Sequence, residues 1–288
     1  MKKFKRVFYE CGLWMKSLLY LFYWFFNHIF KSDLKNHIKI VKQGETIDII
    51  VNGPSFTEQQ EIVKNDGFDK CMVNYAANTP IFWELKPTYY CISDPHFFKR
   101  TYKSSVQEFL TNINKVDWDI TIFVTYYAFK HYLAKSTLIN NNKVKIIPFH
   151  STPLPYTFKF KHLAYKLFKG GQAMPDPSSV SIPTVMNIIN SGYSNINLYG
   201  FDHDWIHNVV VDNKNQVCLY DTHYYNEKGE YIPWLKNETE TFRMYEVLQT
   251  QVELFESYWF IKEYVDYLGN VKVINKSPNS LLDAFDRD

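Results

Sequence analysis

Residues 47–64, IDIIVNGPSFTEQQEIVK, predict a buried strand that runs through one tight turn into a helix. Apart from Asp48, the first five residues are apolar and β-branched, which is typical of a strand covered on both faces. A Gly-Pro pair favours the turn, and Ser55 followed three residues later by Glu58 has the spacing of a capping box. Unpaired N–H groups at such a helix start favour an anion such as a nucleotide phosphate. Many strand–turn–helix units bind nothing, so this pattern alone leaves a purely structural role open.

Short apolar segments of the same kind recur along the chain and alternate with segments of helical character. We expect strands at residues 47–51, 70–74, 89–93, 120–125, 144–149, 196–199 and 271–274. We expect helices at residues 56–64, 96–113, 128–134, 182–191 and about 238–268. This alternation predicts an α/β fold, with a mostly parallel, Rossmann-like sheet flanked by helices and a ligand site beyond the carboxyl ends of its strands.

The chain divides into a basic, aromatic leader, residues 1–42, and one larger domain, residues 43–288. Two stretches of that domain lack a clear period. Residues 150–181 are rich in Pro, Gly, Ser and Lys, and residues 201–234 are polar and aromatic. Long irregular segments in a compact domain are usually functional lids or disorder. Both stretches follow predicted strands, so we expect them beside the site, with residues 201–235 forming a lid-like insert.

The composition bounds the class of protein. With 288 residues, of which 46% are hydrophobic, the chain can form one large α/β domain with a substantial core. Four scattered Cys residues contain no CxxC pair and indicate reduced thiols of a cytoplasmic protein. The aromatic share of 18% includes 22 Tyr, and tyrosines suit sugar-facing surfaces because each offers an apolar ring and a hydroxyl. No signal-peptide cleavage pattern is evident.

The leader differs from the rest of the chain in charge. Residues 1–42 hold nine Lys or Arg against two acidic residues, whereas the remainder holds 23 basic and 28 acidic residues. A basic leader on an acidic body indicates a membrane surface rather than nucleic acid. Its aromatic run is broken by charges and falls short of the ~20 apolar residues of a spanning helix. We expect an amphipathic helix lying on the cytoplasmic face of a bacterial inner membrane. The alternative is a helix packed on the protein's own core or on a second subunit.

Several strand-end motifs follow one another in a recognisable order. They are Asn52-Gly53-Pro54-Ser55, Asn74, Ser93-Asp94-Pro95-His96-Phe97-Phe98, Gly192-Tyr193, Gly200-Phe201-Asp202 and Ser277-Pro278-Asn279-Ser280-Leu281-Leu282. With these motifs the sequence resembles the bacterial sialyltransferases of the Campylobacter and Haemophilus type, and the wider group of flagellin-modifying and capsule transferases. The similarity runs in order from about Ile47 to Phe285.

The resemblance implies a fold, a reaction and a set of donor-binding residues. The fold would be a single GT-A-like domain without a metal requirement. The reaction would transfer a CMP-activated 2-keto sugar acid, with inversion, to a sugar hydroxyl. Asp94 departs from the family's usual Asn, and only part of the family's Thr-Ser-Gly turn is retained at Ser179 and Ser181. The donor-binding positions implied are Asn52, Gly53, Ser55, Asn74, Asp94, Ser179, Ser181, Gly200 and Asp202.

Inverting transfer also needs a base for the acceptor proton and donors for the charge that develops on the departing phosphate. His223 falls near the family's His-Tyr element, and no His stands a few residues later, where the family's usual base is found. We therefore expect His223 to be the base. The neighbouring tyrosines that could donate to the phosphate are Tyr220, Tyr224 and Tyr225.

Other interpretations remain open. Asp202 and Asp204 form an Asp-x-Asp pattern, by which many glycosyltransferases hold a divalent metal against a nucleotide diphosphate. His203 and His207 are alternative bases, and His96 could cap the following helix or contact the donor. A pterin diphosphokinase-like enzyme, which would need Mg²⁺ and ATP, and an inactive membrane scaffold are the remaining alternatives.

The sequence as a whole predicts a membrane-associated glycosyltransferase that extends a lipid-linked glycan, such as lipooligosaccharide or a capsule precursor. Its partners would be a CMP-activated nonulosonic or ulosonic acid, a glycan or glycolipid acceptor and the membrane surface, with no nucleic acid. No cofactor is expected, and a homo-oligomer is left open.

Overall fold

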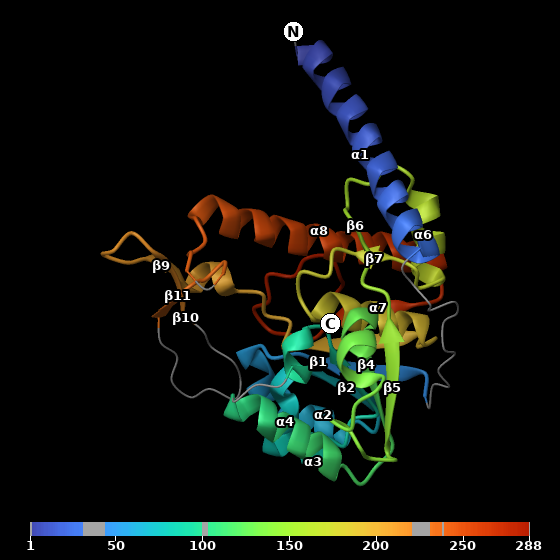
Figure 1. Ribbon diagram of the computed structural model, residues 1–288, viewed down its shortest axis with the longest axis vertical. Helices are drawn as coiled ribbons and strands as arrows, with labels where there is room; N and C mark the ends of the chain where they lie inside the picture. The colour runs from blue at the N-terminus through green and yellow to red at the C-terminus, as the bar shows by residue number, and fades with distance from the viewer. Residues whose placement is uncertain (1, 31–43, 100–102, 221–230, 238, 288) are drawn as a thin grey trace.

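A parallel sheet of seven strands forms the centre of the molecule (Figure 1). The computed structural model describes residues 2–30, 44–99, 103–220, 231–237 and 239–287. The strand order is β12–β8–β1–β2–β3–β4–β5, and every neighbouring pair is parallel. The strands are β1 (Thr46–Ile50), β2 (Asp69–Val73), β3 (Tyr89–Ile92), β4 (Ile120–Thr125), β5 (Val144–Phe149), β8 (Asn195–Tyr199) and β12 (Lys272–Asn275). All seven predicted strands are confirmed within one or two residues, and so is the Rossmann-like α/β class.

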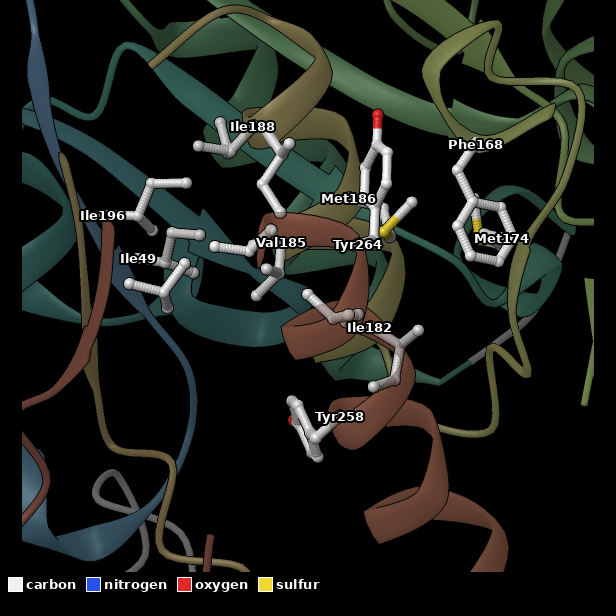
Figure 2. Packing of buried hydrophobic residues seen from close by; sticks show 14 of the residues in the cluster. Ile49, Phe168, Met174, Ile182, Val185, Met186, Ile188, Ile196, Tyr258 and Tyr264 are labelled. Carbon is white, nitrogen blue, oxygen red and sulfur yellow. The ribbon is translucent and has the colours of Figure 1, made fainter. Parts of the chain in front are cut away.

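One face of the sheet is covered by α6 (Lys161–Lys169), α7 (Ser181–Asn190) and α8 (Met244–Leu268). Successive side chains of a strand point to opposite faces, so Ile47 and Ile49 of β1 belong to this side. Figure 2 shows four apolar side chains of α7 packed between Ile49 and Ile196 of the strands and the rings of Tyr258 and Tyr264 from α8. Eight of the ten residues of α7 are buried, so this helix anchors the layer.

The opposite face is covered by α2 (Gln60–Asn65), α3 (Pro80–Leu85) and α4 (Ser104–Lys115). Ile50 of β1 packs here, together with Phe82 of α3 and Phe109 of α4. Two separate apolar layers therefore enclose the sheet, which explains why its strands read as nearly continuous apolar runs.

Asp48 is the polar exception in β1, and the structure pairs it. Its side chain is fully buried on the α2–α4 face, with Lys70 of β2 and Asn197 of β8 beside it in register. Lys70 Nζ lies 3.0 Å from Asp48 Oδ2, and Asn197 Nδ2 donates to Asp48 Oδ1 at 2.8 Å. Burial, together with the neighbouring Asp66, raises the pKa of Asp48 to about 7. Lys70 and Asn197 offset part of the cost of burying this group inside the sheet.

The predicted helices are partly wrong in type and extent. The turn after β1 is the 3-10 helix η1 (Pro54–Gln59), and α2 begins only at Gln60. The segment expected to be helical at 96–113 contains the 3-10 turn η3 (Pro95–Phe98) and then α4. The helix expected at 128–134 consists of α5 (Tyr126–Ala128) and the π-helical turn η4 (Phe129–Leu133). The short helices η2 (Asn74–Asn78) and α3 and the longer α6 were not expected.

The segment expected to be an irregular lid contains short strands. After the 3-10 turn η5 (Trp205–Asn208), β9 (Val209–Val211), β10 (Val217–Tyr220) and β11 (Tyr231–Pro233) form an antiparallel sheet in the order β11–β10–β9. This small sheet stands apart from the main sheet, near the start of α8 (Figure 1). Residues 150–181 are also more regular than expected, because β6 (Pro153–Leu154) and β7 (Met174–Pro175) pair on either side of α6.

The leader forms α1 (Lys2–Phe30), whose N-terminal end projects beyond the rest of the chain (Figure 1). One side of α1 contacts the domain: Ser17 is buried and its Oγ accepts from Lys159 N at 3.0 Å, and Trp14 packs edge-on against Phe160. The other side leaves many large apolar side chains exposed. Among the described residues, no helix is long and apolar enough to cross a membrane.

Candidate functional site

The carboxyl edge of the main sheet is hollowed beside β1. β1 lies between β2 and β8, so the strand order reverses direction at this point, where open α/β sheets bind ligands. A cavity of about 190 Å³ lies beyond the ends of β1 and β8, and a second of about 510 Å³ lies beyond β2, β3 and β4. Asn52, Asn74 and Val180 line both. The two cavities are therefore halves of one recess.

The recess gathers eight of the nine positions implied for donor binding. The first cavity is lined by Asn52, Gly53, Asn74, Ser179, Ser181, Gly200 and Asp202. Asp94 lines the second cavity, and Ser55, the ninth position, lies beside the recess in contact with Asp202. These residues come from segments far apart in sequence, and the carboxyl ends of parallel strands bring them to one edge.

Of the three positions expected to carry the chemistry, only Tyr220 falls within the described residues. Tyr220 ends β10 in the small sheet, with its ring 5.0 Å from that of Tyr231, and it lines neither cavity. His223 and Tyr224 fall outside the described residues, so their roles stay predictions.

Gly53 and Gly200 let the ends of β1 and β8 approach each other. Gly53 N donates to Gly200 O at 3.0 Å, which continues the pairing of the two strands past their ends. A Cβ atom on Gly53 would lie 2.2 Å from Gly200 O, and one on Gly200 would lie 2.5 Å from Val51 O. Gly200 also has a φ of +71°, which disfavours any other residue. The two glycines thus shape the floor of the first cavity through the backbone.

At the start of η1, Ser55 forms hydrogen bonds with the carboxylate of Asp202. Ser55 N donates to Asp202 Oδ2 at 2.9 Å, and Ser55 Oγ donates to Asp202 Oδ1. The expected capping box of Ser55 and Glu58 is not formed, because the carboxylate of Asp202 takes its place. Burial raises the pKa of Asp202, and the bonds from Ser55 oppose that rise. A negative group of the protein therefore occupies the helix start at which we expected a phosphate.

The amide side chains of the recess are better placed to receive a ligand. Asn52 lines both cavities, and its Oδ1 is buried without a hydrogen-bond partner among the described residues. Buried polar atoms are nearly always paired, so this atom is free, among the described residues, to accept a hydrogen bond from a ligand. Asn74 has a φ of +51°, a conformation that Asn tolerates better than most residues, and its carbonyl accepts from Tyr90 OH at 2.6 Å.

Behind the first cavity, four side chains form a continuous chain of hydrogen bonds. Ser181 Oγ donates to Ser179 Oγ at 2.9 Å, and Tyr258 OH donates to Ser181 Oγ at 2.6 Å. Tyr258 OH also lies 2.7 Å from His203 Nε2. Because the Tyr258 proton is used on Ser181, His203 Nε2 carries the proton that completes the chain. Burial lowers the pKa of His203 to about 3 and raises that of Tyr258, so both stay neutral at pH 7.

A second array lines the larger cavity. His96 Nδ1 lies 2.8 Å from Asp94 Oδ2, and His96 Nε2 lies 2.8 Å from Tyr75 OH. Asp94 Oδ1 also accepts from His96 N at 2.8 Å, so Asp94 caps η3 as well as holding the ring. Asp94, and not His96, is therefore the cap of η3, and contact between His96 and the donor stays a prediction.

The recess contains several polar side chains but carries little positive charge. Among the described residues that line the two cavities there is no Lys or Arg. The described residues also contain no group of three or more His, Cys, Asp or Glu side chains arranged to hold a metal ion. Both carboxylate oxygens of Asp202 are taken by Ser55, which weakens the Asp202–Asp204 interpretation as a metal site.

Sequence reasoning missed Tyr75 and Tyr258. Tyr75 follows Asn74 directly at a predicted strand end, and this adjacency was the available signal. Tyr258 is in the middle of α8 and reaches the site only because α8 packs across α7. No local pattern distinguishes Tyr258 from the other aromatic residues of that helix.

Comparison with known proteins finds structural likeness only. No family model matches the chain, and no curated protein matches it. Among solved structures, the MAf glycosyltransferase from Magnetospirillum magneticum AMB-1 is 12% identical with a TM-score of 0.46; the match covers 88% of this chain and 35% of that one. The chain thus spans about a third of the length of that protein.

Two structures of the sialyltransferase CstII from Campylobacter jejuni are also similar. The complex with the substrate analogue CMP-3FNeuAc is 14% identical with a TM-score of 0.39, and 85% of each chain is covered. The complex with cytidine-5'-monophosphate is 15% identical with a TM-score of 0.40, and 84% of each chain is covered. At this level of likeness, the function has to be argued from the site itself.

Proposed function

We propose that this protein is a glycosyltransferase that takes a sugar acid from a CMP donor and passes it to a glycan hydroxyl. The observation that carries the proposal is the recess at the β1–β8 reversal, which gathers eight positions that the motif order assigned to such a donor. Those positions were chosen from sequence alone and lie on separate segments, so their meeting at one edge supports the assignment.

The charge of the recess favours a monophosphate diester over a diphosphate. A CMP-linked sugar carries one negative charge at its phosphate, which amide and hydroxyl donors can stabilise. A nucleoside diphosphate places at least two charges on adjacent phosphates, which are usually held by a metal ion or by basic side chains, whereas the second charge of a CMP-linked sugar acid is on its separate carboxylate. The lining residues of the described recess include amides, hydroxyls and acids but no Lys or Arg. We therefore propose metal-independent binding of CMP.

Asn52 and Asn74 are the proposed contacts to the nucleotide. The buried, unpaired Oδ1 of Asn52 suits a ribose hydroxyl or a cytosine amino group. Ser179 Oγ accepts from Ser181, which leaves the Ser179 proton to donate to the carboxylate of the sugar acid, and both serines line the same cavity. Asp202 contributes indirectly, by fixing Ser55 and the turn that carries Asn52.

The acceptor and the location of the protein are proposed from α1 and the sequence of the leader. The exposed apolar side of α1, next to a leader rich in Lys and Arg, suits a membrane surface that bears anionic lipid. A glycosyltransferase held at such a surface would meet a lipid-linked glycan, so we propose a glycolipid precursor as the acceptor.

Thermal-shift binding tests the donor class. The full chain is heated with CMP, CDP, UDP, GDP or ATP, each with and without EDTA. We expect CMP to raise the melting temperature whether or not EDTA is present. Stabilisation only by a diphosphate or by ATP with a divalent metal would contradict the proposal. It would favour the alternative in which Asp204 helps to hold a metal ion. Failure of every nucleotide to stabilise the chain would favour the inactive scaffold.

Two variants link the shift to the recess. Asn74→Gly removes the side chain without straining a backbone with a φ of +51°, and Asn52→Ala removes the unpaired amide. Both are expected to weaken CMP binding by about tenfold or more, the cost of a lost hydrogen bond to a charged or desolvated group. Asn142→Ala is the control, because Asn142 is exposed just before β5, at the opposite edge of the sheet.

A further inference from the structure

Adjacent strands bring Tyr75, Asp94 and His96 together. β2 ends at Val73 and β3 at Ile92, and the two strands are parallel neighbours. The residues that follow them therefore emerge side by side at the carboxyl edge of the sheet. All three line the larger cavity.

The array is held in place from several sides. The ring of Phe97 lies 4.5 Å from that of Tyr75 and 4.3 Å from that of His96. Asp94 bonds both the backbone N–H and the imidazole of His96. His96 keeps 35% of its side chain exposed, so the array is accessible from the cavity while its rings are fixed.

The proton positions follow from the partners. An ionised carboxylate only accepts hydrogen bonds, so the proton of the neutral imidazole is on Nδ1, facing Asp94. His96 Nε2 then offers a lone pair, and the Tyr75 hydroxyl donates to it. Because both ring nitrogens are engaged, a proton from a bound ligand reaches His96 through the Tyr75 hydroxyl.

We propose that Tyr75 takes the acceptor proton during transfer, with His96 as its proton store and Asp94 as the group that orients and stabilises His96. The inference rests on the function proposed above. The acceptor oxygen forms a bond to the anomeric carbon as the bond from that carbon to the CMP phosphate oxygen breaks, and the electron pair leaves with CMP. The acceptor proton moves to the Tyr75 oxygen while the Tyr75 proton moves to His96 Nε2. The resulting imidazolium faces the carboxylate of Asp94.

This arrangement explains why an acid stands at position 94. Asn is the usual residue there in the family that the sequence resembles, and an amide could cap η3 equally well. Only a carboxylate stabilises a positively charged imidazole, which is the state that the proton transfer creates. The Asp at position 94 and the His two residues later are thus explained together, as a carboxylate and the imidazole that it stabilises.

The test measures CMP release from CMP-N-acetylneuraminic acid, with a galactoside or water as acceptor. Tyr75→Phe and His96→Gln should each lower kcat by about 10²–10⁴-fold, the range for a lost general acid–base group, and should leave the donor KM nearly unchanged. Asp94→Asn keeps a hydrogen-bond acceptor without the charge and should lower kcat less.

Matched controls come from a second His–Tyr ring pair. His162 on α6 and Tyr267 on α8 have ring centroids 6.0 Å apart and line neither cavity. His162→Gln and Tyr267→Phe remove the same atoms from the protein and should leave kcat unchanged. His223→Gln is measured beside them, because His223 is the competing base from the sequence.

CMP binding by thermal shift separates the two proposals. If CMP fails to stabilise the wild type, the proposed function is overturned and this inference falls with it. If CMP stabilises the wild type and the Tyr75 and His96 variants alike while kcat drops only in the variants, the inference is supported. CMP binding with full kcat in His96→Gln, or a loss confined to His223→Gln, contradicts the inference alone. A wild type that binds CMP but never releases it from the donor contradicts the proposed function as well as the inference.

Discussion

His203 shows how burial decides the role of a single residue. From the sequence it was an alternative base, since it follows Asp202 at a strand end. In the structure it is buried against α8, with Nε2 bonded to Tyr258, and its pKa falls to about 3. A base with so low a pKa is far too weak to take an acceptor proton near pH 7. Its neutral ring instead completes the hydrogen-bond chain that positions Ser181 and Ser179.

The buried His203 should make the protein sensitive to acid. Its pKa is about 3 when folded and near 6.5 when unfolded, so the unfolded chain binds the proton more readily between these values. The stability contributed by neutral His203 is therefore complete above about pH 6.5 and is lost progressively as the pH falls toward 3. At pH 4.5 the loss is about 3 kcal/mol, because each pH unit below the unfolded pKa costs about 1.4 kcal/mol.

Urea unfolding at pH 7 and pH 4.5 measures this effect, with His203→Asn as the comparison. Asn does not titrate, and it tolerates the φ of +50° found at this position. The variant should be less stable than the wild type at pH 7, because it breaks the contact with Tyr258, but the gap should narrow or reverse at pH 4.5. An equal gap at both pH values would show that His203 is not held neutral.

At the scale of elements, the junction of β1 and β8 forms the floor of the site. The two strands continue to pair past their ends through Val51 and Gly53, which leaves no room for a side chain at Gly200. Because the Asn52 amide is carried by this junction, distortion here would move the nucleotide contacts as well as lower stability.

Two glycines with nearly the same φ angle allow the cost of backbone strain to be measured apart from the cost of steric crowding. Gly200 and Gly269 have φ values of +71° and +70°, but an added Cβ meets Val51 O at 2.5 Å in the first and nothing within 4 Å in the second. Gly269→Ala should therefore cost about 1–2 kcal/mol, the strain of a left-handed residue. Gly200→Ala should cost about 1–3 kcal/mol more, because the backbone of β1 must shift. Chemical denaturation of both variants checks this order, and equal losses would show that the junction is loose.

The elements that the sequence could predict are those whose pattern is local. The strands are short apolar runs, and a run covered on both faces reads the same wherever it lies in the chain. The helix after β1 was wrong in type because Pro54 and the contact with Asp202 set the geometry of η1, and Asp202 is 147 residues away from Ser55. The helix α6 was missed because Pro and Gly around it masked a short amphipathic segment.

In the candidate site, too, the sequence predicted what depends on local patterns and missed what depends on long-range contacts. Residues at strand ends could be predicted as neighbours, because a parallel sheet collects its carboxyl ends at one edge. The sequence could not predict which of these residues face the ligand and which form hydrogen bonds with each other, because both depend on packing across the whole fold. Asp202 and Ser55 were both expected to face the donor, and the structure pairs them with each other.

At the scale of the whole molecule, α1 combines the two interpretations drawn from the leader. Ser17, Tyr20 and Trp24 form a side that packs on the domain, as a structural helix would. The remaining circumference exposes large apolar side chains such as Leu18 and Phe22, at 57% and 69% of their accessible surface. A helix anchored to the domain on one side and apolar on the other can hold the recess at a fixed distance from a membrane surface.

Vesicle sedimentation tests this role of α1. The full chain should sediment with phosphatidylcholine vesicles that contain anionic phosphatidylglycerol, and less with phosphatidylcholine alone or in high salt, because the basic leader contributes through charge. The double substitution Leu18→Glu and Phe22→Glu should weaken binding at least tenfold, since burying two such side chains is worth about 3–6 kcal/mol. Ile232→Glu with Leu235→Glu is the control, because these exposed apolar residues belong to the small-sheet region.

A second copy of the chain could cover the same side of α1 instead. Sedimentation velocity without lipid distinguishes the membrane role from self-association. If the α1 substitutions dissociate a dimer and leave vesicle binding unchanged, this side of α1 serves self-association, and the membrane role is contradicted.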